Sequence, residues 1–214
     1  MLVTAHSGCD STPDNSLDFV RHALQLQVDA LEVDVWQKEG KLILSHDEPE
    51  DMNHPLLEEV FVMVKEHPSM MVNCDLKEKE LEEAVYALAE RCGMEKRIFF
   101  SGEVRLSIHE VMPEMDGRVL INAENLIPDI YEHGEKFLDE DSEELIRLCR
   151  KYGFDVINVN YRFATDCFVK VADREHVGIS FWTVTDREDI PHVISWHPYN
   201  VTSRSPGLVL EMKQ

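Results

Sequence analysis

Short runs of apolar and β-branched residues alternate along this chain with longer segments whose apolar positions recur every three or four residues. Runs of the first kind are typical of buried strands, and segments of the second kind of amphipathic helices. The pattern predicts strands at 2–6, 30–35, 70–76, 97–102, 118–123, 155–160, 178–184 and 200–203. We find no linker and no repeat of fixed period, so residues 1–214 are predicted to form a single domain.

Three of the intervening segments carry clear helical patterns. Residues 15–26 begin with Asn15 and Ser16, each of which is a suitable N-cap. Residues 78–93 end at Gly93, which is a suitable C-cap. Residues 142–153 are expected to begin with a Ser142 cap and to stop at Gly153.

Apolar strands separated by helices predict a parallel sheet that is covered by helices. A closed (β/α)8 barrel, the TIM barrel, is the simplest arrangement of this many units. At 214 residues it would be a compact example, because the typical barrel has about 250 residues. A doubly wound open sheet is the alternative, although no GxGxxG motif follows the first predicted strand.

The second predicted strand departs from simple alternation. The turn sequence QKEG follows it, and the next residues again have strand character. Gly40 marks a tight turn, so we predict a β-hairpin that extends the second strand past its carboxyl end. Pairing about a centre near residues 39 and 40 places His46 opposite Val33 or Asp34.

Glu32 and Asp34 lie two residues apart on this strand, so their side chains point to the same face. Apolar residues at 31, 33 and 35 occupy the other face. Two carboxylates on a covered face repel each other, and their burial is costly unless a positive charge joins them. A divalent cation would supply that charge. The alternative for an acid-rich chain is that the acids simply lie on a solvated surface.

Other predicted strands also end in chemically active side chains. His6 ends the first strand, Asp75 and Lys77 follow the third, and Trp182 lies near the end of a late strand. Taken singly, each residue has an ordinary structural explanation. In a parallel barrel, however, the carboxyl ends of all strands surround one mouth, where active sites lie. Their joint placement therefore predicts a site at that mouth.

The chain has 42 acidic residues against 21 Lys and Arg, a formal net charge of −21. This charge argues against binding to nucleic acid or to anionic membrane surfaces, which require basic surface. No apolar run approaches the roughly 18 residues of a membrane helix, and MLVTAHSG does not read as a signal peptide. The five scattered cysteines favour a reducing compartment, so we predict a cytoplasmic protein.

The segment AHSG…TPDNSLDF…ALEVDVWQKEGKLILSHDE resembles the opening of the glycerophosphodiester phosphodiesterase family, which reads H-R-G, P-E-N-T, E-x-D-V, a turn and H-D. VNCDLKE, FWTVTD and VTSRSP resemble further family segments, so the resemblance runs along nearly the whole chain. It implies a (β/α)8 barrel with a divalent cation. The implied reaction is hydrolysis of a glycerol phosphodiester, a small-molecule substrate, to glycerol 3-phosphate and an alcohol.

The resemblance also assigns roles to individual residues. The resemblance implies that the metal ligands are Glu32, Asp34 and Asp75. The implied acid/base pair is His6 and His46. Lys77 would contact the phosphate, and Trp182 would line the glycerol pocket. Ligands that are all oxygen favour Mg²⁺ or Ca²⁺ over zinc.

This sequence departs from the family pattern at several positions. Ser7 stands where the family has an Arg that clamps phosphate, and Asp14 and Asp75 stand where it more often has Glu. The segment that follows His46 is short, which implies a more open site. Two alternatives follow: a degenerate barrel that binds metal and phosphodiester with little turnover, or a related phospholipid phosphodiesterase or lyase that forms a cyclic phosphate.

Overall fold

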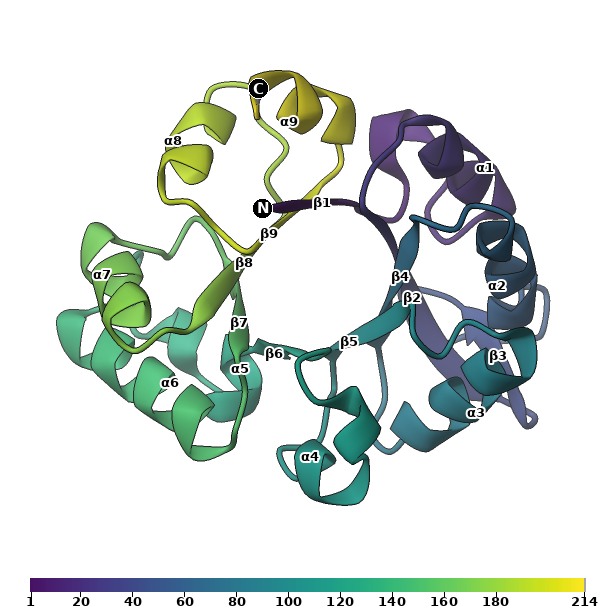
Figure 1. Ribbon diagram of the computed structural model, residues 1–214, viewed down its shortest axis with the longest axis horizontal. Helices are drawn as coiled ribbons and strands as arrows, with labels where there is room; N and C mark the ends of the chain where they lie inside the picture. The colour runs from purple at the N-terminus through teal and green to yellow at the C-terminus, as the bar shows by residue number, and fades with distance from the viewer. Residues whose placement is uncertain (214) are drawn as a thin grey trace.

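The computed structural model describes residues 1–213, in which parallel strands form a ring inside a layer of helices (Figure 1). The ring consists of β1 (Leu2–Ala5), β2 (Ala30–Lys38), β4 (Met71–Leu76), β5 (Ile98–Gly102), β6 (Leu120–Asn122), β7 (Val156–Asn160), β8 (Gly178–Trp182) and β9 (Asn200–Ser203). Pairing runs in the order β5-β4-β2-β1-β9-β8-β7-β6. A single bridge between Phe100 and Val119 joins β5 to the segment before β6. The predicted (β/α)8 barrel is therefore confirmed.

The outer layer buries the apolar face of each helix against the strands. Fully buried Phe19, Phe61 and Phe168 lie in α1, α2 and α7 and belong to one continuous core. The helices are α1 (Leu17–Gln25), α2 (Leu57–Lys65), α3 (Glu82–Cys92), α4 (Ile108–Val111), α5 (Ala123–Leu126), α6 (Asp139–Lys151), α7 (Asp166–Arg174), α8 (Ile190–Ser195) and α9 (Pro206–Met212). None of the helices in residues 1–213 combines the length and apolar composition needed to cross a bilayer.

Two of the predicted helix caps agree with the structure, and one does not. Ser16 caps α1, because its side-chain oxygen accepts a hydrogen bond of 3.0 Å from the Phe19 amide. Gly93 caps α3 in the left-handed conformation, with φ of 71°. The predicted Ser142 cap is wrong: α6 begins at Asp139, and the Ser142 hydroxyl donates back to the Leu138 carbonyl. Acidic residues fill the first turn of α6, where they interact favourably with the helix dipole, so the helix begins earlier.

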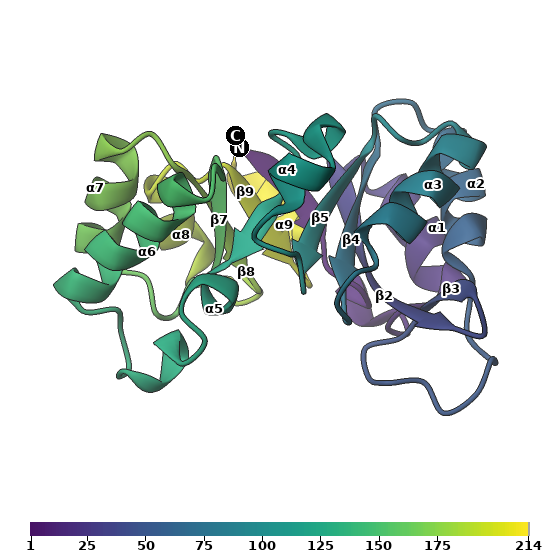
Figure 2. The same ribbon diagram turned by 90° about the horizontal axis from the view of Figure 1, so that it is seen from below.

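The predicted hairpin is confirmed, with β3 (Lys41–Leu44) antiparallel to β2. Val35 pairs with Leu44, and the same register continued by two residues sets His46 level with Val33. The Ser45 amide extends the pairing with a bond of 3.2 Å to the Asp34 carbonyl. Figure 2 shows the hairpin at the end of the barrel opposite the chain termini.

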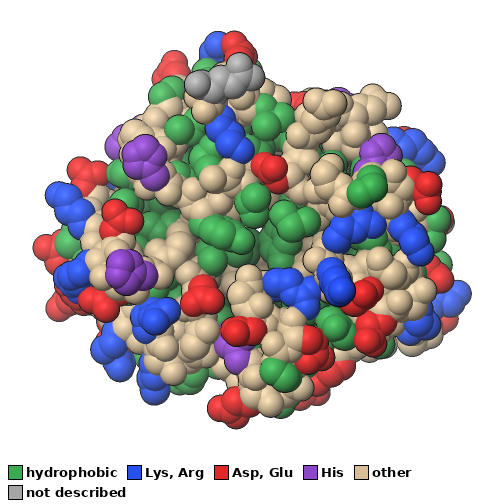
Figure 3. Space-filling model, in the orientation of Figure 1, with side chains coloured by type: hydrophobic (Ala, Val, Ile, Leu, Met, Phe, Trp, Pro, Cys, Tyr) green, Lys and Arg blue, Asp and Glu red, His purple; other side chains and the backbone are tan. Residues whose placement is uncertain are grey.

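The two ends of the barrel differ in character. Hydrophobic side chains gather over the centre of the ring on the face shown in Figure 3, where the strands begin. Leu2, Met71 and Tyr199 line a small cavity there. Polar side chains collect instead at the opposite end, where the strands finish.

Candidate active site

A cavity of about 430 Å³ opens at the carboxyl ends of the strands. It contains every residue that the sequence singled out for the site. Its lining consists of His6, Glu32, Asp34, His46, Asp75, Lys77, Asn122, Glu124, Asn158, Trp182, Thr183 and Arg204. Because parallel strands finish at one end of a barrel, side chains from distant parts of the chain converge there.

Asn15 holds Asp34 from two directions. Its side-chain amide donates to Asp34 Oδ2 at 2.6 Å, and its amide oxygen accepts from the Asp34 backbone N–H at 3.0 Å. The backbone amide of Asn15 donates in turn to Ser7 Oγ at 2.6 Å. Asn15 has φ of 50°, a conformation that Asn tolerates better than most residues. The PDNS turn therefore positions one of the predicted metal ligands.

Lys77 joins two of the three predicted metal ligands. Its Nζ lies 2.9 Å from Asp34 Oδ1 and 2.6 Å from Asp75 Oδ2. Burial disfavours the charged form of Lys77, but the two carboxylates outweigh burial and raise its pKa. Burial raises the pKa of Asp75, although Lys77 and a 2.6 Å hydrogen bond from Ser101 Oγ partly offset this effect.

Glu32 has little compensation for its charge in the cavity. Its Oε2 accepts one hydrogen bond of 2.9 Å from Asn73 Nδ2. Burial, together with the nearby carboxylates of Asp75 and Asp34, raises the pKa of Glu32 well above the usual range of a Glu side chain. A cation bound beside Glu32 would relieve this repulsion.

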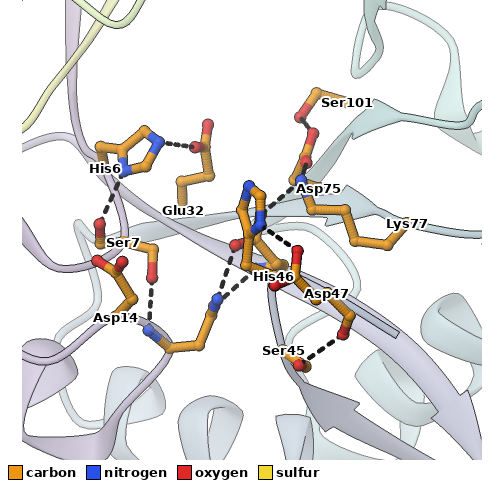
Figure 4. A network of polar contacts seen from close by, with 12 residues as sticks. His6, Ser7, Asp14, Glu32, Ser45, His46, Asp47, Asp75, Lys77 and Ser101 are labelled. Carbon is orange, nitrogen blue, oxygen red and sulfur yellow. Dashed lines mark hydrogen bonds and ion pairs between the residues drawn. The ribbon is translucent and has the colours of Figure 1, made fainter. Parts of the chain in front are cut away.

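The two predicted acid/base residues differ in exposure. The Nδ1 of half-buried His6 lies 2.7 Å from the Ser7 carbonyl, which can only accept, so that nitrogen carries a proton. Its Nε2 is left facing Glu32 Oε1 at 3.7 Å (Figure 4). Burial lowers the pKa of His6, which favours the neutral imidazole. The His46 side chain is 67% exposed, and its Nδ1 lies 2.9 Å from Asp47 Oδ1.

Sequence reasoning missed several polar residues in or beside the cavity. Asn73 lies two residues before Asp75 on β4, so strand alternation could have indicated its direction. Asn122 and Asn158 are linked by a hydrogen bond of 2.8 Å between β6 and β7. Within residues 1–213, the buried Oδ1 of Asn158 and the buried Nε1 of Trp182 have no hydrogen-bond partner. They leave a free acceptor and a free donor on residues that line the cavity.

The described residues contain one ready-made cluster of metal-ligand atoms, and it is not the predicted one. Cys9, Asp10 and His22 have ligand atoms within 4.8 Å of one another. Burial and the neighbouring Asp10 charge raise the pKa of Cys9 to about 12, so its thiol stays protonated and is a poor ligand. His22 is satisfied by Asp10 at 2.9 Å. We read this cluster as structural.

Replacing Asn15 with Ala is expected to reduce the free energy of unfolding by about 1–3 kcal/mol, because Asp34 would lose a buried hydrogen-bond donor. Chemical denaturation measures the change. Asn53→Ala, at an exposed position, is the matched control and should change stability by less than about 0.5 kcal/mol. Equal stability of the two variants would contradict the proposed positioning of Asp34.

The fold and the convergence of acidic, basic and imidazole groups at one mouth define a (β/α)8 barrel with an enzyme-like site. No family model matches the chain. A curated relative from Bacillus altitudinis, named glycerophosphodiester phosphodiesterase, is 28% identical over 172 residues, with 60% of this chain and 70% of the relative covered.

Solved structures extend this similarity to the whole barrel. A putative glycerophosphoryl diester phosphodiesterase from Agrobacterium tumefaciens has a TM-score of 0.83 at 15% identity, covering 100% of this chain and 97% of that chain. An Oleispira antarctica phosphodiesterase in complex with the product sn-glycerol-3-phosphate has a TM-score of 0.74 at 15% identity, covering 99% and 96%. These findings confirm the resemblance to glycerophosphodiester phosphodiesterases that the motifs indicate.

Proteins with other activities share this fold. A phosphoribosylanthranilate isomerase from Pyrococcus furiosus also matches, with a TM-score of 0.60 at 17% identity, covering 100% of this chain and 96% of that chain. The activity must therefore be argued from the site.

Proposed function

We propose that this protein hydrolyses glycerophosphodiesters to glycerol 3-phosphate and an alcohol. The observation that carries the proposal is that one cavity is lined by all seven residues to which the resemblance assigns a role. The similarity in sequence to the Bacillus altitudinis phosphodiesterase supports it independently of that geometry.

Glu32, Asp34 and Asp75 are the residues that would hold a divalent cation. Their donor chemistry fits a hard ion, because all three offer carboxylate oxygens and the single ammonium of Lys77 leaves negative charge uncompensated. Such a cation, Mg²⁺ or Ca²⁺, would withdraw charge from a phosphodiester oxygen.

Side chains of this protein would carry out the proton transfers and bind the phosphate. His6 and His46 would divide the proton transfers, one accepting the proton of the attacking group and the other donating to the leaving oxygen. Each such contribution is typically about 10²–10⁴-fold. Lys77 would place its positive charge against a non-bridging phosphate oxygen, which requires it to share its contacts with Asp34 and Asp75.

A glycerol moiety suits the opposite wall of the cavity. Trp182 Nε1 and Asn158 Oδ1 are unpartnered but buried, so a glycerol hydroxyl would accept from the first or donate to the second once a small side-chain movement exposed them. A buried polar atom without a partner is costly, so a ligand that satisfies both atoms gains affinity. The indole ring also offers an apolar surface to the carbon chain of the ligand.

The central experiment is an assay of glycerol 3-phosphate release from a panel of glycerophosphodiesters, in the presence of Mg²⁺, Ca²⁺ or a chelator. Release that depends on the cation supports the proposal. A cyclic phosphate product would instead identify a lyase. Binding of the diester without any product would identify a degenerate binding barrel, the alternative that Ser7 favours.

A further inference from the structure

Apart from the proposed metal ion, positively charged side chains of the cavity would bind the phosphate group of the substrate. Ser7 occupies the position at which the resemblance predicts a phosphate-clamping Arg. Its side chain is buried, with its hydroxyl engaged by the Asn15 amide at 2.6 Å. The Lys77 ammonium already forms ion pairs with two carboxylates. Among the cavity-lining residues of the described chain, the only other Lys or Arg is Arg204.

The fold brings Arg204 to the same part of the mouth as Ser7. Arg204 directly follows β9, which pairs in parallel with β1, so that Ser203 lies beside Ala5. The Arg204 carbonyl accepts a hydrogen bond of 2.8 Å from the Asp10 amide. These contacts fasten Arg204 to the loop that begins at His6.

The guanidinium of Arg204 lies over that loop. A Cβ added to Gly8 would lie 3.0 Å from Arg204 Nη1, so the guanidinium passes within contact distance of the residue next to Ser7. The missing positive charge at position 7 is therefore supplied nearby, from the last strand.

Asp14 holds Arg204 in a way that still permits ligand binding. Their closest contact, Nη1 to Oδ1, is 2.8 Å, and the second contact, Nη2 to Oδ2, is 3.4 Å. The two side chains are 41% and 53% exposed. Exposed ion pairs of this kind are typically worth about 0–1 kcal/mol, so an incoming phosphate can share or replace the carboxylate. A planar guanidinium is well suited to bidentate phosphate contacts.

We propose that Arg204 binds the phosphate group of the substrate and takes the place of the arginine that is absent at position 7. The inference rests on the proposed function, which names a phosphodiester as substrate. It places the phosphate between Arg204 and Lys77, on the side of the cavity where His6 lies. It also explains how an acidic chain without the expected clamp retains a cationic phosphate site.

Steady-state kinetics of Arg204→Gln on a glycerophosphodiester tests this inference. We expect KM to rise about tenfold or more while kcat changes by less than about threefold, since a tenfold loss corresponds to about 1.4 kcal/mol of binding. Arg204→Lys should show an intermediate KM, because lysine keeps the charge and loses the bidentate geometry. A KM for Arg204→Gln within twofold of the parent value would overturn the inference.

Two control variants separate phosphate binding from structural effects. Arg174→Gln removes a similarly exposed, ion-paired arginine on α7 and should leave KM unchanged. Asp14→Asn breaks the same ion pair but keeps the Arg204 charge, so it should raise KM much less than Arg204→Gln does. If Asp14→Asn raised KM as much as Arg204→Gln, the effect would come from the lost ion pair, and the inference would be wrong.

Calorimetric binding of sn-glycerol 3-phosphate and of inorganic phosphate distinguishes this inference from the proposed function. Parent protein that releases no product, yet binds these anions about tenfold more tightly than Arg204→Gln, would refute the hydrolase and support the role of Arg204. Equal binding by parent and variant would overturn the role of Arg204 even in an active enzyme. Parent protein that binds neither anion would overturn both.

Discussion

Glu32→Gln is expected to remove most of the turnover and to leave the metal-free protein at least as stable as the parent. Glu32 is buried close to two other carboxylates, and this environment raises its pKa. Gln has nearly the same shape and can still accept the hydrogen bond that Asn73 donates to Glu32. The substitution removes the repulsion along with a metal ligand, so we expect the free energy of unfolding to rise by about 1 kcal/mol. Glycerol 3-phosphate release should fall by about 10²-fold or more, which corresponds to about 2.7 kcal/mol.

Thermal unfolding with chelator, and then with Mg²⁺ or Ca²⁺, measures both effects. The cation should raise the melting temperature of the parent and not that of Glu32→Gln, because a ligand stabilises only the state that binds it. Glu58→Gln, at an exposed position on α2, is the matched control and should behave as the parent does. If the Glu32→Gln variant kept either its turnover or its response to the cation, the assignment of Glu32 as a metal ligand would be wrong.

The pH dependence of stability provides a further check on Glu32 in chelator. A folded-state pKa raised above the unfolded value of 4.5 means that the folded state holds the proton more tightly. The contribution of Glu32 to stability is therefore lost as the pH rises from about 4.5 to about 8, and Gln at position 32 makes no such pH-dependent contribution. The stability difference between variant and parent should thus widen over this range and level off above about pH 8.

His46→Ala is expected to lower kcat by about 10²–10⁴-fold, because the variant lacks one of the two groups proposed to transfer protons. Its stability should change by less than about 0.5 kcal/mol. The His46 side chain is 67% exposed and makes a polar contact with the neighbouring Asp47, so its removal leaves no buried cavity.

Activity and denaturation of His46→Ala would be compared with those of His67→Ala, which removes an exposed imidazole from the segment after α2. The control should keep full activity. Near-parental turnover by His46→Ala would show that the acid/base assignment is wrong. A large loss of stability would show instead that the hairpin loop depends on His46 for its structure.

The sequence predicted the site best where a residue's direction follows from strand geometry. Strand alternation set Glu32 and Asp34 on one face, and the turn at Gly40 fixed the hairpin register that returns His46 to their level. The sequence was less informative where a side chain has two suitable partners. Asn15 and Ser16 were both candidate N-caps; in the structure Ser16 caps α1, and the Asn15 side chain hydrogen-bonds to Asp34.

Local pattern by itself determined that this protein has a parallel sheet covered by helices, with its chemistry at one end of the strands. Apolar strands must be covered on both faces, and parallel strands all finish on the same side. Only the tertiary structure decided which side chains meet there. Asp14 and Arg204 are 190 positions apart in sequence, and they form an ion pair because β9 returns to lie beside β1 and closes the ring. Contacts across that closure depend on the register between the first and last strands, which no local pattern in either strand specifies.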